Sequence, residues 1–198
     1  MIKSPVSRPY WIDTDNLGNL IFNEQTSNQI GVLDVKNESL VEYMIPSKNP
    51  NWADCEDKSD SNCGVAQIFG FDVADGKIWF TEWAENKIGV VDTKKQLPFS
   101  VTTNTDSIIL KKGETETVTL GIDYLSNIAE INFNSAHTAS TVTTSSDILV
   151  SHTMNQSNEI TVYVTASDFA LSGDYKLLLG IFNSDVNVSK YIDVTIKP

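Results

Sequence analysis

The chain contains an internal sequence repeat, and this repeat restricts its fold more than any other feature. The stretch KIWFTEWAENKIGVVD, residues 77–92, follows NLIFNEQTSNQIGVLD, residues 19–34, without a gap and at an offset of 58 positions, as from Glu24 to Glu82. Each copy must form the same supersecondary unit, which buries its apolar face against a neighbour. The positions that are identical in the two copies are Phe22/Phe80, Glu24/Glu82, Asn28/Asn86, Ile30/Ile88, Gly31/Gly89, Val32/Val90 and Asp34/Asp92.

Each copy is expected to form a β-meander. Short apolar runs follow turn-forming segments that contain glycine, and a polar turn separates one run from the next. This strand–turn–strand rhythm is typical of a propeller blade. The period exceeds the usual blade length because the polar insert 47–65 adds a loop. The expected strands are 20–22, 29–33 and 40–45 in the first copy and 78–80 and 87–91 in the second.

The second half of the chain differs from the first. All four tryptophans and both cysteines precede residue 90, and a polar stretch ending at Pro98 stops the repeat. We therefore expect two domains, 1–96 and 97–198. Short alternating runs predict a two-sheet sandwich after residue 97, and Gly173–Leu177 has the tyrosine-corner pattern. The runs are 107–110, 116–122, 147–150, 159–164, 175–179 and 191–196.

The segments GKIWFTE (76–82) and NKIGVVD (86–92) resemble the blades of streptogramin (virginiamycin B) lyase-like propellers, and the first copy resembles them more loosely. The second half is similar to immunoglobulin-like modules of archaeal and bacterial surface proteins, on ILKKGETETVTLGI (109–122) and GDYKLLL (173–179). The expected fold class is all-β: a partial β-propeller of two blades followed by an immunoglobulin-like β-sandwich. The second resemblance implies a spacer or adhesion role and no chemistry.

The first resemblance implies a carbon–oxygen lyase that opens a cyclic depsipeptide by elimination, with a histidine base, a glutamate and Mg²⁺. The first half contains no histidine, because His137 and His152 both lie in the second half. No catalytic histidine can be carried over, and we expect a protein without catalytic activity; the Mg²⁺-dependent enzyme, or a fragment of one, is the alternative. Glu24 and Glu82 are interpreted as structural residues of the repeat, with metal ligation as the alternative.

The insert holds the remaining candidates for a site. Cys55 and Cys63 are expected to form a disulfide that would stabilise a loop without its own core, and too few ligands are near for a zinc site. The acidic residues Asp54, Asp57 and Asp60 are weak candidates for Ca²⁺ binding, because hard cations prefer oxygen ligands. A solvated acidic loop is the simpler interpretation, so no cofactor is expected.

Charge and sequons bear on location and partners. The net charge of −12 argues against nucleic acid and anionic membrane surfaces as partners. No apolar run is long enough for a membrane span, and no signal peptide is visible in this chain. The cysteine pair and three sequons, at Asn37, Asn155 and Asn187, predict an extracellular or cell-surface protein.

Two blades alone would leave apolar faces in water, since fewer than about three repeats rarely form a stable stack. We therefore expect an interaction or structural protein whose blade surfaces pack on a partner chain or on further blades, in an oligomer or a larger complex.

Overall fold

The computed structural model describes residues 7–47, 66–127, 130–138, 147–155 and 158–198. Within these ranges the chain is all-β, as expected: it forms several antiparallel sheets, none of them closed, and a single short 3-10 turn, η1 (Trp83–Glu85). It divides into two compact units. The N-terminal unit holds residues up to Gln96 and the short segment Phe182–Asn187, and the C-terminal unit holds Leu97–Ile181 and Val188–Pro198.

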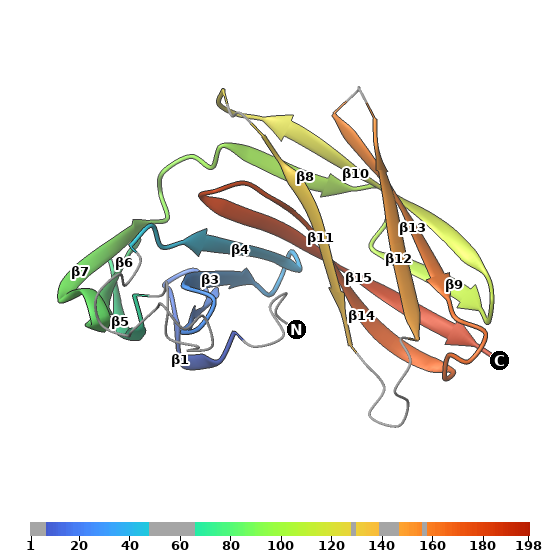
Figure 1. Ribbon diagram of the computed structural model, residues 1–198, viewed down its shortest axis with the longest axis horizontal. Coiled ribbons are helices and arrows are strands. Elements are labelled where there is room, and N and C mark those ends of the chain that lie inside the picture. The colour runs from blue at the N-terminus through green and yellow to red at the C-terminus, as the bar shows by residue number, and fades with distance from the viewer. Residues whose placement is uncertain (1–6, 48–65, 128–129, 139–146, 156–157) are drawn as a thin grey trace, which may run out of the picture. The chain divides into compact units, whose positions relative to one another are not determined.

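The N-terminal unit contains two antiparallel sheets, one for each copy of the repeat (Figure 1). In the first sheet the strands follow chain order: β1 (Pro9–Thr14), β2 (Leu20–Glu24), β3 (Gln29–Asp34) and β4 (Ser39–Met44). The second sheet likewise runs β5 (Ile68–Ala74), β6 (Lys77–Glu82) and β7 (Lys87–Asp92). Beside β4, the Met44 N–H donates to the Asp185 carbonyl at 2.8 Å.

The two copies match in the details of the backbone. Arg8 and Gln67 both take the left-handed conformation, with φ of 48° and 54°, and each is followed by a bulged strand. The Gln25 N–H donates to the Arg8 carbonyl at 3.3 Å, and the Trp83 N–H donates to the Gln67 carbonyl at 3.1 Å. The repeat in the sequence is therefore a repeat of local structure, and it includes β1 and β5, which the sequence reading did not define as strands.

Successive side chains of a strand point to opposite sides, so each sheet has two faces. One face of the first sheet carries Ile21 and Ile30, and one face of the second sheet carries Ile78, Phe80 and Val91. These side chains form a single buried cluster, together with Ile45, Ala66 and Ile68. The core of the N-terminal unit is thus the contact between unlike faces of two equivalent sheets.

The C-terminal unit also contains two sheets (Figure 1). One has the order β12-β13-β10-β8, and the other has the order β11-β14-β15-β9, in which β9 runs parallel to β15. The Tyr175 hydroxyl donates to the Leu171 carbonyl at 2.8 Å, which is the bond that the tyrosine-corner pattern predicts. The strands are β8 (Phe99–Thr103), β9 (Ser107–Lys111), β10 (Thr115–Tyr124), β11 (Asn132–His137), β12 (Ile148–Met154), β13 (Glu159–Ala166), β14 (Gly173–Phe182) and β15 (Val186–Lys197).

Candidate interaction surface

The outward face of the second sheet exposes three large apolar side chains, Trp79, Ile88 and Val90, which we call the exposed strip. Trp79 on β6 is directly opposite Val90 on β7, and Ile88 is opposite Thr81, so the three side chains lie on one face. Their exposed fractions are 45% for Trp79, 74% for Ile88 and 48% for Val90. Apolar side chains gathered on one face, unlike those scattered singly, mark an interaction site.

The first sheet shows what covers this face when a neighbour is present. At the offset of the repeat, the exposed strip corresponds to Ile21, Ile30 and Val32. Ile21 is 1% exposed, Ile30 is fully buried, and Val32 packs against the same cluster. The face of the second sheet that carries Ile78, Phe80 and Val91 covers them. The same positions are therefore core in one copy and surface in the other, because the second sheet has no third sheet beyond it in the described part of the chain.

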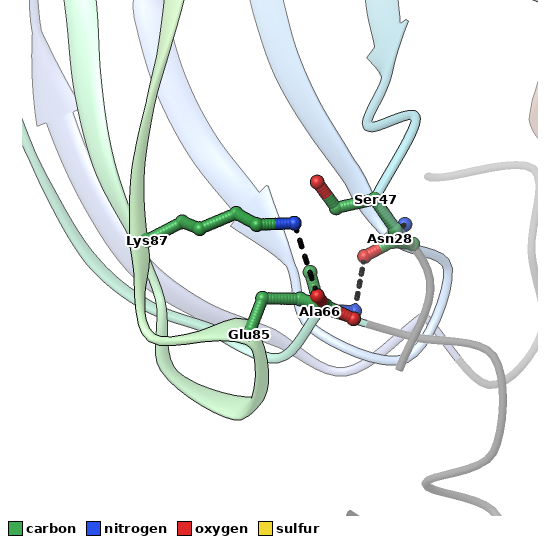
Figure 2. Close-up of polar contacts among 5 residues, drawn as sticks. All are labelled: Asn28, Ser47, Ala66, Glu85 and Lys87. Carbon is green, nitrogen blue, oxygen red and sulfur yellow. Dashed lines mark hydrogen bonds and ion pairs between the residues drawn. The ribbon is translucent and has the colours of Figure 1, made fainter. Parts of the chain in front are cut away.

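The side chain of Asn28 joins the two ends of the insert (Figure 2). Its Nδ2 donates to the carbonyls of Ile45 at 2.8 Å and Ser47 at 2.9 Å, and its Oδ1 accepts from the Ala66 N–H at 2.8 Å. The backbone at Asn28 is left-handed, with φ of 59°, a conformation that asparagine tolerates well. Its repeat equivalent Asn86 has φ of 52° but is exposed.

Three aromatic rings of the N-terminal unit form a row. Tyr10 on β1 contacts Phe69 on β5 edge to face, with ring centroids 5.8 Å apart, and Phe69 contacts Trp83 in the same way at 5.3 Å. All three are more than a third exposed. Such contacts fix the orientation of the rings and leave part of each ring open to a ligand or partner.

A buried pair of carboxyl groups lies on the other face of the first sheet. Glu24 is fully buried and Glu42 is 1% exposed. Burial, followed by the negative charge of Glu42 and a hydrogen bond shared with it, raises the pKa of Glu24 to about 9, while the hydroxyls of Ser7 and Ser27 act in the opposite direction. Because the pKa of Glu24 lies well above neutral pH, its carboxyl group holds a proton there.

Glu42 has a second partner in the same unit. The Nδ2 of Asn187, which is fully buried, donates to Glu42 Oε2. This arrangement has no signal in the sequence, because Glu42 has no equivalent inside the second copy and Asn187 is far away along the chain. Only the pairing of β3 with β4, which sets Glu42 opposite Gly31, shows that Glu42 shares a face with Glu24.

The candidate metal ligands do not come together in the described residues. Glu24 ends β2 and Glu82 ends β6, in two different sheets, and both are buried. No group of three or more histidine, cysteine, aspartate or glutamate side chains within the described ranges could hold a metal ion. The proposed disulfide of Cys55 with Cys63 and the acidic candidates Asp54, Asp57 and Asp60 lie outside the described residues.

The three sequons occupy different environments. Asn37 lies in an exposed turn, where its Nδ2 donates to Asp34 Oδ2 at 2.5 Å, and Asn155 is exposed at the end of β12. Asn187 is fully buried. A glycan needs an accessible amide, so Asn37 and Asn155 are placed for modification in the folded chain and Asn187 is not.

The two histidines are in the C-terminal unit. His137 ends β11, and the His152 ring on β12 lies 4.4 Å from that of Phe133. Among the helices of the described residues, none has the length and apolarity needed to cross a membrane.

Comparisons with known proteins leave the family of the chain open. No protein-family model matches it, and no curated protein matches it. Among solved structures, the ZirS C-terminal domain is 12% identical with a TM-score of 0.34, over 50% of this chain and 66% of that one. A chimeric titin Z1Z2 is 17% identical with a TM-score of 0.29, over 50% and 94%.

A third solved structure, the S-layer protein rSbsC, is 13% identical with a TM-score of 0.37. The match to the S-layer protein covers 92% of this chain but only 24% of that protein. The match to the ZirS domain covers just under two thirds of that domain. These likenesses are too low to carry an argument about fold family or function.

Proposed function

We propose that this chain is a non-catalytic interaction protein of the cell exterior or cell surface, which binds a protein partner through the exposed strip of its second sheet. The observation that carries the proposal is the contrast between equivalent positions: Trp79 and Ile88 are exposed, whereas Ile21 and Ile30 are core. Burying a large apolar side chain contributes about 1.5 to 3 kcal/mol, so covering the strip would be favourable.

The finer architecture belongs to the same proposal. We assign the N-terminal unit as two blades of a lyase-like propeller, supported by the stacking of unlike faces and by the repeated backbone pattern. We assign the C-terminal unit as an immunoglobulin-like sandwich, supported by its strand orders and by the Tyr175 hydrogen bond. In this architecture the C-terminal unit is a spacer and the N-terminal unit carries the binding face.

The proposal is tested by making the exposed strip polar. The triple variant Trp79→Thr, Ile88→Thr and Val90→Thr keeps residues that suit a strand and removes the apolar surface. We expect the parent chain to bind an apolar fluorescent dye and the variant to bind much less of it. The matched control is Ile109→Thr with Leu149→Thr, because those side chains are exposed to a similar degree, 56% and 53%, in the other unit.

Two results would overturn the proposal. A parent chain that binds no dye would show that the strip is not an interaction surface, and a variant that binds as much dye as the parent would show the same. Turnover of a cyclic depsipeptide of the streptogramin B class by the purified chain would establish the lyase alternative in its place.

A further inference from the structure

We propose that the partner presents a further three-stranded meander of this repeat type, whose apolar Ile–Phe–Val face covers the exposed strip as the second sheet covers the first. This inference rests on the interaction function proposed above and names the chemistry of the partner. The second copy shows such a face in use: Ile78, Phe80 and Val91 cover Ile21 and Ile30 in the first sheet.

The sequence of the exposed strip fits this partner. Trp79, Ile88 and Val90 stand at the positions of Ile21, Ile30 and Val32, in strands that pair in the same register. Ile88 is identical to its equivalent, and Val90 is identical to Val32. An apolar face that keeps the residue types and the register of a sheet-binding face is suited to another sheet, because strand side chains stand at fixed spacings.

The hydrogen bonds of Asn28 between the two sheets indicate the same kind of partner. The Asn28 side chain forms hydrogen bonds with the backbone of Ile45 and Ser47, which follow the first sheet, and of Ala66, which precedes the second. Asn86 is the identical residue in the second copy, has the same left-handed backbone and is exposed. A following meander would bring its own first residues to Asn86 in the way that Ala66 meets Asn28.

The aromatic row extends along the same direction. Tyr10 and Phe69 occupy equivalent positions in the two bulged strands, and they contact each other edge to face. A further meander would place its own aromatic residue of this kind beside Phe69 and Trp83, which are 41% and 54% exposed.

A second copy of the chain does not offer the required face. Its Ile78, Phe80 and Val91 are already buried in its own core. The equivalent face of its first sheet carries Phe22, which is 7% exposed, and the partly buried Leu20 and Leu33. The meander must therefore come from elsewhere than these 198 residues.

The experiment supplies the missing meander within the full chain. Residues 35–92, one whole period of 58, are written again directly after Asp92, where the repeat would continue in register. The added copy carries Trp79→Phe and Trp83→Phe, so that the original Trp79 can be identified by mass spectrometry. Hydroxyl-radical labelling then measures the exposure of that side chain, and circular dichroism checks that the chain is folded.

We expect labelling of the original Trp79 to fall several-fold in the tandem chain. It should remain at the parental level in a control tandem chain whose added copy also carries Ile78→Ser and Phe80→Ser. A folded tandem chain that leaves Trp79 as accessible as in the parent overturns the inference, and so does equal protection by the serine control.

If the tandem chain does not fold, a synthetic peptide of residues 66–93 added to the parent chain decides the question. Protection of Trp79 that saturates with peptide supports the inference, and unchanged labelling at millimolar peptide overturns it. Protection that grows with the concentration of the parent chain alone would assign the strip to self-pairing and overturn it as well. If the dye binds the strip but neither form of the meander covers it, this inference fails while the proposed function stands.

Discussion

The ring of Phe22 lies directly over Gly31 on the neighbouring strand. A Cβ atom at Gly31 would come within 2.4 Å of Phe22 Cζ, and one at Gly89 would come within 2.2 Å of Phe80 Cζ. The phenylalanine and the glycine of the sequence repeat therefore pack together, because the glycine has no side chain at the place that the ring occupies. This accounts for two of the seven positions that are identical in both copies.

Gly31→Ala should destabilise the N-terminal unit by about 1 to 3 kcal/mol, because the new methyl group displaces a buried ring from a close-packed site. Urea unfolding followed by tryptophan fluorescence measures the change, since every tryptophan precedes residue 90. Gly70→Ala is the matched control, because a Cβ there meets nothing within 4 Å. Equal stability of the two variants would contradict the account of the Phe22 contact.

Asn28→Ala should cost more than Asn86→Ala, although both replace an asparagine that has a left-handed backbone. The backbone penalty is common to the two, so their difference measures the contacts of Asn28 with Ile45, Ser47 and Ala66. We expect that difference to be about 1 to 3 kcal/mol, because the Ala66 N–H and two carbonyls would lose their partner. Matched losses in urea unfolding would show that the side chain does not hold the ends of the insert.

Glu24→Gln should stabilise the chain at alkaline pH and flatten the dependence of its stability on pH. The pKa of Glu24 is about 9 in the folded chain against an ordinary 4.5. Between these values the folded chain holds a proton that the unfolded chain has released, so its stability is full below pH 4.5 and falls as the pH rises toward 9. At pH 8, about 3.5 units above the ordinary pKa of 4.5, this linkage makes the gain on the order of 5 kcal/mol.

Urea midpoints of the parent and of Glu24→Gln, taken from pH 5 to pH 9, test this relation. The gap between them should widen with pH. Glu82→Gln serves as the comparison, because its position lies in the sheet that has no counterpart of Glu42. A parent chain whose stability rises over this interval would refute the buried proton.

Tyr175→Phe should weaken the C-terminal unit by about 1 to 2 kcal/mol, because the buried Tyr175 side chain loses the hydrogen bond that its hydroxyl donates to the Leu171 carbonyl at 2.8 Å. Far-ultraviolet circular dichroism during urea unfolding reports the strands of both units, and the part of its change that tryptophan fluorescence does not follow belongs to this unit, which contains no tryptophan. Tyr163→Phe, at a side chain that is 37% exposed on β13, should leave the midpoint close to that of the parent. If Tyr163→Phe lowered the urea midpoint more than Tyr175→Phe did, the stabilising role of the Tyr175 hydrogen bond would be contradicted.

The sequence predicted well whatever depends on local pattern. The all-β class, the strands of both copies and the Tyr175 hydrogen bond follow from alternation, turn residues and short motifs. Strands β1 and β5 were not predicted, because each contains a bulge that interrupts the alternation of side chains between the two faces. The family resemblance of the two halves stays a prediction.

Contacts between distant segments could not be predicted in the same way. The pairing of Glu42 with Glu24 depends on the register of β4, and the bond from Asn187 comes from the far end of the chain. The parallel alignment of β9 with β15 likewise has no local signal. The sequence could identify the residues of the exposed strip by alternation, but only the burial of Ile21 and Ile30 shows which face a neighbour covers.

The hydrogen bonds of Asn28 to Ser47 and to Ala66 have a consequence for how this chain can change over time. They hold Ser47 and Ala66 close together, whatever sequence connects these two residues. Doubling the length of a connection between fixed ends costs only about 0.6 kcal/mol in closure entropy. The position between Ser47 and Ala66 is therefore a place where foreign sequence, such as an epitope or a whole small domain, can be grafted with little effect on the scaffold.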